Sequence, residues 1–175
     1  MPTDQTNTDA FPADFFKGAG LISTTDGIGT RVSDNDFADI NPSYAGEFES
    51  FSKVKTFMAS GSARLTLRFR VPGTDTEGVV SGFGIVFSDV DRDGAAHITL
   101  YALDGSNLGN YIAPVRSDSA GHSFIGVVYD RPLVARVEVT SGEAALAAGT
   151  DDLTDGGAHD LVITDDFLYG EPQPQ

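Results

Sequence analysis

The sequence of 175 residues contains neither cysteine nor tryptophan, and it is poor in basic side chains. Without cysteine, the chain has no disulfide, no thiolate metal site and no cysteine nucleophile. Without tryptophan, it lacks the largest aromatic surface on which a flat polysaccharide can stack. Eleven Lys and Arg stand against 26 Asp and Glu, a net charge of -15. This charge disfavours nucleic acid and anionic membranes as partners, because both need a positive face.

Long apolar runs are also missing, because no stretch approaches the roughly 20 residues of a membrane-spanning helix. The opening letters, MPTDQTNTDAF, show no basic segment followed by an apolar core. A signal peptide is therefore not recognisable in this chain. Because a chain is often cut after its signal peptide, we still expect a secreted or cell-surface protein.

Aspartate supplies most of the acid, with 20 Asp against 6 Glu. Aspartate favours turns, where its short side chain bonds nearby backbone, and calcium loops, where carboxylates converge. Adaptation to salt explains the same excess, and 8 Arg against 3 Lys agrees with it. The composition thus favours cations as partners and leaves both explanations open.

The pattern along the chain predicts an all-β protein. Residues 63–71, ARLTLRFRV, alternate strictly between apolar and polar, whereas residues 79–90 are apolar on both faces and contain glycine. Residues 96–115 predict a hairpin around an Asp-Gly turn. Residues 122–130 and 132–142 are expected to pair with each other, and residues 159–170 to form the last strand. We predict a jelly-roll β-sandwich of roughly ten antiparallel strands.

The domain organisation expected from the sequence is simple. Residues 1–10 form a flexible N-terminal segment, residues 11–170 a single β-sandwich domain, and residues 171–175, EPQPQ, a linker stub. No internal repeat is visible.

The segment DVDRDG resembles the first half of a calcium loop. Asp89, Asp91 and Asp93 alternate, and Gly94 follows, as in positions 1, 3, 5 and 6 of an EF-hand. Position 12 is Leu100 rather than Glu, so the segment is not an EF-hand. Two hypotheses remain: a calcium turn whose other ligands come from another loop, or a tight acidic turn without metal.

A second acidic pair, Asp165 and Asp166, lies inside the last predicted strand. Successive side chains of a strand point to opposite faces, so one of these carboxylates should face the interior. A buried carboxylate needs a cation, a basic partner or several backbone N–H donors. We therefore predict a structural calcium near this pair, with backbone N–H groups or an Arg as the alternative.

Other candidate residues are less specific. Tyr44, Tyr101 and Tyr111 are candidate ligand-binding residues, although tyrosines in strands are more often packing residues. Glu47 and Glu49 are expected two apart on one strand face, where carboxylates seldom flank a sugar as glycoside hydrolysis requires. The three histidines show no zinc spacing, and no nucleophile or phosphate-loop motif occurs. We therefore do not expect an enzyme.

Five motifs taken in order carry a resemblance. They are SGFGIVFSDVD, ITLYALDGSNLGNYIAPV, HSFIGVVYD, ARVEVTSG and DLVITDDFLYGEP. Together, over about residues 44–172, the sequence resembles an uncharacterised domain of secreted bacterial surface proteins, many of which carry a PEP-CTERM sorting tail. That tail is not present here.

More distantly, VITDDFLYG is similar to the last strand of carbohydrate-binding modules and MAM-type jelly rolls. The resemblance implies that Asp165 or Asp166 helps to hold a structural calcium, with Asp14 or Glu49 as partner. The missing tryptophan departs from the carbohydrate-binding pattern.

These observations favour a non-catalytic, calcium-stabilised extracellular module that binds carbohydrate or acts in adhesion. Its expected partner is a glycan or a surface polymer, its cofactor is structural calcium, and nucleic acid is not expected. The alternatives are a structural surface or matrix protein without a small ligand, and a jelly-roll glycoside hydrolase or lyase.

Overall fold

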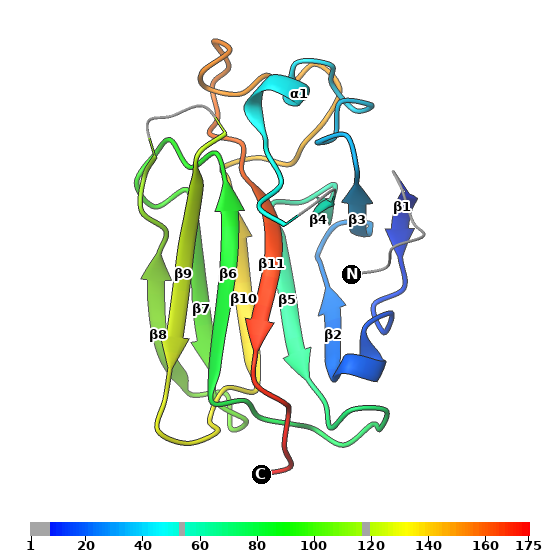
Figure 1. The fold of residues 1–175 in the computed structure, drawn as a ribbon, viewed down its shortest axis with the longest axis vertical. Coiled ribbons are helices and arrows are strands. Elements are labelled where there is room, and N and C mark those ends of the chain that lie inside the picture. The colour runs from blue at the N-terminus through cyan, green and yellow to red at the C-terminus, as the bar shows by residue number, and fades with distance from the viewer. Residues whose placement is uncertain (1–7, 53–54, 117–119) are drawn as a thin grey trace.

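The computed structural model describes residues 8–52, 55–116 and 120–175, which form two antiparallel β-sheets packed face to face (Figure 1). The strands are β1 (Thr8–Phe11), β2 (Leu21–Thr24), β3 (Gly29–Ser33), β4 (Thr56–Ser60), β5 (Arg64–Phe69), β6 (Gly82–Ser88), β7 (Ala96–Tyr101), β8 (Asn107–Ile112), β9 (His122–Val128), β10 (Arg136–Ser141) and β11 (Ile163–Tyr169). The short helices are η1 (Lys17–Ala19) and α1 (Tyr44–Glu47).

The order of the strands confirms the predicted sandwich. One sheet has the order β1-β3-β4-β11-β6-β9, and the other has the order β2-β5-β10-β7-β8. From β4 to β7 and again from β8 to β11, successive strands alternate between the sheets, as in a jelly roll. The predicted hairpin is β7 and β8, which pair directly.

The expected pairing of residues 122–130 with residues 132–142 is wrong. β9 pairs with β6, and β10 lies between β5 and β7 in the opposite sheet. The two strands are adjacent in sequence, but the chain between them crosses the sandwich instead of making a hairpin.

The core lies between the sheets. Leu65, Leu67 and Phe69 of β5 are buried, as their alternation with polar residues predicts. Phe69 contacts Phe83 of β6 at a ring-centroid distance of 6.3 Å, which joins the two sheets. Because the core fixes both sheets, the loops at each end are held at defined positions.

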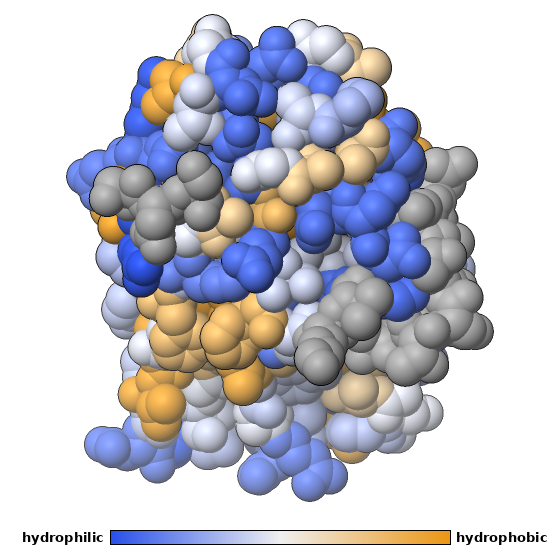
Figure 2. Space-filling view, turned by 45° about the horizontal axis from the view of Figure 1, so that its top comes forward, coloured by the Kyte–Doolittle hydropathy of each residue, from blue (hydrophilic) through white to orange (hydrophobic). Residues whose placement is uncertain are grey.

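Apolar side chains also lie on the outer face of the six-stranded sheet. Phe124 and Val128 of β9 and Leu168 of β11 are more than half exposed. The Phe124 ring lies over Gly84 and Gly126, where any side chain would collide with it. Figure 2 shows such a hydrophobic patch below a mainly hydrophilic end of the molecule.

The ends of the chain extend the sandwich. Of the segment expected to be flexible, residues 1–7 lie outside the described residues, and β1 begins at Thr8. Within the expected stub, Pro172 is buried, and Gln173 exchanges two backbone hydrogen bonds with Val79. Within the described parts of the chain, no helix has the length and apolar character needed to cross a membrane.

Candidate metal centre

Five acidic side chains from three segments meet at one end of the sandwich, the upper end in Figure 1. Glu47 is the last residue of α1, whereas Asp89 and Asp91 follow β6. Asp152 and Asp160 lie in the long connection between β10 and β11. The centre therefore depends on the tertiary fold, because Glu47 and Asp160 are more than a hundred residues apart in sequence.

Asp89 is held in an unusual backbone conformation. Its φ is 69°, in the left-handed region that Asp tolerates better than most residues. The side chain is 1% exposed, and its Oδ1 accepts a hydrogen bond from the Ala120 N–H at 3.3 Å. Its Oδ2 is buried and has no hydrogen-bond donor among the described residues. A buried carboxylate oxygen in this state requires a proton or a cation.

Asp152 is fully buried and fixed by backbone donors. Its Oδ1 accepts the Leu161 N–H at 2.7 Å, and its Oδ2 accepts the Thr154 N–H at 2.8 Å. The Thr154 hydroxyl lies 2.8 Å from Asp152 Oδ2 and 2.5 Å from Glu47 Oε2. One hydroxyl carries one proton, so it does not fully satisfy both carboxylates.

Asp160 anchors the other side of the centre. Its Oδ2 accepts the N–H groups of Asp91 and Arg92 at 3.0 and 2.6 Å, which fixes the turn after β6. Its Oδ1 is buried without a donor, and so is Asp91 Oδ2. The Arg92 guanidinium turns away and binds Glu143 Oε2 at 2.7 Å.

The five carboxylates form two overlapping groups. Glu47, Asp89 and Asp152 each offer an oxygen within 4.8 Å of the others. Asp91, Asp152 and Asp160 do the same, so Asp152 belongs to both. Among the described residues, no basic side chain forms an ion pair with any of the five.

The electrostatics follow from this crowding. Burial, reinforced by Asp152, Asp91 and Glu47, raises the pKa of Asp89 to about 8. Burial raises the pKa of Asp160 to about 6 against the opposing effect of its two backbone donors. The pKa values of Glu47 and Asp91 are also raised, again chiefly by burial. Each of these groups resists ionisation unless a positive charge is supplied.

The donor set fits a hard divalent cation. All five side chains offer oxygen, and neither histidine nor cysteine takes part in either group. Calcium binds six to eight oxygen ligands from carboxylates, carbonyls and water, whereas zinc and copper prefer nitrogen or sulfur. The buried oxygens without donors are therefore consistent with calcium ligands.

The centre includes part of the predicted metal site. Asp89 and Asp91 belong to it, whereas Asp93 is exposed. Among the described residues, neither carboxylate group includes Asp165 or Asp166. The suggested partners Asp14 and Glu49 are exposed and outside both groups as well.

Asp165 is buried, as predicted, and backbone donors satisfy it. Its Oδ2 accepts the N–H groups of Phe51 and Ser52 at 2.6 and 3.0 Å, and the Ser52 hydroxyl binds Asp166 at 2.9 Å. The strand carries an irregularity at this point, between Thr164 and Phe167. These contacts match the alternative of a carboxylate held by backbone N–H groups.

Replacing Asp165 tests which role it has. We expect Asp165→Ala to lower the free energy of unfolding by about 2 kcal/mol, because two part-buried N–H groups lose their acceptor. The loss should be equal in calcium and in chelator, as measured by urea unfolding. Asp166→Ala is the matched control. A loss seen only in calcium would instead assign Asp165 to a metal site.

The two carboxylates considered for glycoside hydrolysis, Glu47 and Glu49, do not lie on a strand. Glu47 ends the helical turn α1 and is buried, and Glu49 follows in an irregular segment and is exposed. The expectation of a common strand face is therefore wrong, because the chain turns at α1 instead of extending.

The three candidate tyrosines lie in different environments. Tyr44 is fully buried, and its hydroxyl donates to the Thr150 carbonyl at 2.7 Å, so it is a core residue. Tyr111 is half-buried with its hydroxyl 3.3 Å from that of Tyr129. Tyr101 lies on the outer face of the five-stranded sheet. The Cζ atom of Arg136 lies over its ring, 3.7 Å from the ring centroid.

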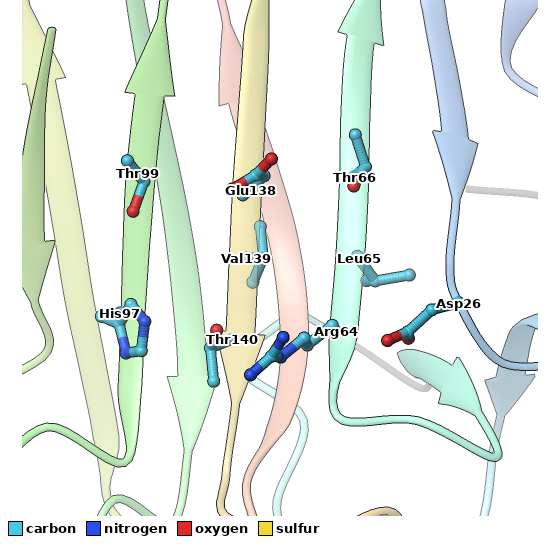
Figure 3. A pocket seen from close by; sticks show the side chains of 9 residues that line it. All are labelled: Asp26, Arg64, Leu65, Thr66, His97, Thr99, Glu138, Val139 and Thr140. Atoms are coloured by element: carbon cyan, nitrogen blue, oxygen red, sulfur yellow. The ribbon is translucent and has the colours of Figure 1, made fainter. Parts of the chain in front are cut away.

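That outer face carries a polar hollow of about 410 Å³ (Figure 3). Alternation along β5, β10 and β7 places outward side chains in register across the three strands. The polar residues of the hollow are Asp26, Arg64, Thr66, His97, Thr99, Glu138 and Thr140. Figure 3 shows the Arg64 guanidinium extending toward Thr140. The surface offers hydrogen-bond donors and acceptors on a rigid sheet.

The comparisons with known proteins are sparse. No family model matches the sequence, and no curated protein does. The chain is similar to the enzymatically active domain of bacteriophage CBA120 tailspike protein 4, with 14% identity and a TM-score of 0.36. It is also similar to the secreted serine protease VesC from Vibrio cholerae, with 12% identity and a TM-score of 0.34. The matches cover 94% and 93% of this chain, but 21% and 28% of the other chains, and carry no argument about activity.

Sequence reasoning missed Glu47, Asp152 and Asp160 as members of the metal centre. The acidic, glycine-rich stretch TDDLTDGGAHD was a signal for Asp152 and Asp160. No local signal marks Glu47, which was interpreted as part of a strand. The sequence pattern does not indicate that these loops lie together, because the fold of the sandwich brings them to the same end.

Proposed function

We propose that this chain is a non-catalytic, calcium-stabilised extracellular module that binds a glycan or another polar surface polymer. The observation that carries the proposal is the five-carboxylate centre, of which four members are buried. Among the described residues, it has oxygens without donors and no basic partner. Extracellular calcium modules work at dissociation constants of about 10⁻⁴–10⁻³ M, which suits a secreted or cell-surface protein.

The polar outer face of the five-stranded sheet supports the binding role. Sugars present many hydroxyls, and the hollow around Thr66, Thr99 and Thr140 offers hydrogen-bonding groups on neighbouring strands. A surface fixed by a folded sheet loses little entropy on binding. Arg64 brings a positive charge to the hollow beside the carboxylates of Asp26 and Glu138, so the hollow offers charge-assisted donors and acceptors to a polar glycan.

The same hollow supports binding rather than catalysis. Its carboxylate Glu138 forms an ion pair with Arg136 and accepts the Tyr101 hydroxyl at 2.9 Å. A carboxylate engaged by both of these partners is not free to act on a bound sugar.

Glycan-array binding by the calcium-loaded protein tests the proposal. We expect retention of a polar glycan without turnover, and about tenfold weaker binding by Arg64→Ala, which removes a charged donor. Leu168→Ala, on the outer face of the other sheet, is the control and should bind normally. Product release from the bound glycan would contradict the non-catalytic role.

The exposed apolar patch favours a second candidate, a structural surface protein that associates with itself. Phe124, Val128 and Leu168 form this patch on the six-stranded sheet. Self-association that Phe124→Ser abolishes, together with an empty glycan array, would favour this candidate.

A further inference from the structure

We infer that the carboxylate centre holds two calcium ions, not one, and that Asp152 bridges them. This inference rests on the proposed function, in which calcium binds at this centre. One ion is assigned to Glu47, Asp89 and Asp152, and the other to Asp91, Asp152 and Asp160.

The distances divide the five side chains between two positions. Calcium lies about 2.3–2.6 Å from its oxygen ligands, so ligands on opposite sides of one ion are at most about 5 Å apart. Each group of three meets this limit, with its oxygens within 4.8 Å of one another. Among the described residues, the two groups share Asp152 and no other side chain. A single ion is therefore coordinated in full by one group, and the two members of the other group that are not shared are left without it.

Both groups need a cation independently. In the first, Asp89 Oδ2 is buried without a donor, and in the second, Asp91 Oδ2 and Asp160 Oδ1 are. An ion placed in one group leaves the orphaned oxygens of the other uncompensated, which is costly in a buried site.

The charge of the centre also indicates two calcium ions. When all five carboxylates are ionised, the centre carries five negative charges. One divalent ion would leave three of them, and two ions would leave one. Because the nearby Arg92 is engaged by Glu143, no described basic side chain removes this excess. Two ions bring the buried charge close to neutrality.

The carboxylate of Asp152 is suited to bridging. Each of its oxygens accepts one backbone N–H, from Leu161 to Oδ1 and from Thr154 to Oδ2. A carboxylate oxygen has two acceptor positions, so one on Oδ1 remains for a cation, and one on Oδ2 remains when the Thr154 hydroxyl donates to Glu47 Oε2 instead. The backbone donors also fix its orientation before any ion binds.

Calcium binding to chelator-stripped protein, measured by equilibrium dialysis, tests the inference. We expect two ions per chain in the native protein. Asp152→Asn should weaken both by about 100-fold or more, since it removes the shared ligand. Glu47→Gln and Asp160→Asn should each weaken a different ion and leave one bound. Asp93→Asn is the matched control, because it makes the same charge change in the same loop at an exposed position.

The outcomes separate the two proposals. One ion per native chain, or the loss of the same ion in Glu47→Gln and Asp160→Asn, would overturn the two-ion centre and leave calcium stabilisation intact. No bound calcium would overturn both. Far-ultraviolet circular dichroism identifies any variant that fails to fold, and the native stoichiometry decides the question without the variants.

Discussion

Removal of calcium is expected to lower the melting temperature of this protein by about 5–10 °C. A ligand bound only by the folded state, at 100 times its dissociation constant, stabilises that state by about 2.7 kcal/mol. For a chain of this size, each 1 kcal/mol shifts the melting temperature by about 2–4 °C. A second ion would add a comparable shift. The measurement is thermal unfolding with chelator and then with about 10 mM calcium, which is about 100 times a dissociation constant of about 10⁻⁴ M, at constant ionic strength.

Magnesium is the necessary comparison. It demands near-octahedral geometry and loses water reluctantly, so a cluster of carboxylates restores less stability with magnesium than with calcium. Asp93→Asn should behave as the native protein does, because Asp93 is exposed and outside the centre. Equal curves in calcium, magnesium and chelator, from protein that elemental analysis shows to be metal-free, would refute calcium stabilisation.

Metal-free protein is expected to lose stability as the pH rises, and Asp89→Asn is expected to abolish much of that loss. The folded-state pKa of Asp89, about 8, lies above its ordinary value of 3.8. The folded state therefore binds more protons than the unfolded state between these values, so stability is full below about pH 4 and falls as the pH approaches 8. Asp160, with a pKa of about 6, contributes in the same direction.

The same substitution should have opposite effects with and without calcium. In chelator at pH 8, Asp89→Asn removes a buried charge and stabilises the fold, whereas in calcium it removes a ligand and destabilises it. Urea unfolding at pH 5 and pH 8, in both conditions, measures the reversal. If Asp89→Asn destabilises the protein equally in all four conditions, its role is packing and not charge.

Much of the fold was predictable because strand signals are local. The alternation in residues 63–71 and the turn at Asp104-Gly105 each act over a few residues, and both are found in β5 and in the β7–β8 hairpin. The choice of partner strand is not local. β9 and β10 follow each other closely, yet belong to different sheets, because a strand pattern does not tell which side of a sandwich comes next.

The candidate site was also predictable only where its signal is local in sequence. Asp89 and Asp91 stood out because alternating acids before a glycine are unusual in a strand end. The burial of Asp165 followed from the period of the strand, but the donors that satisfy it, from Phe51 and Ser52, come from a distant segment. Asp152 is the member that joins both groups, and only the folded chain brings it to Asp89.

The convergence of three loops on Asp152 has a consequence for a chain without cysteine. With calcium in place, the centre ties residues near 47, 90 and 155 together as a covalent cross-link would. Unlike a disulfide, this calcium cross-link is not broken by reductants, and it is lost when the ions are removed. The rigidity of this end of the molecule is then set by the calcium concentration of the surroundings.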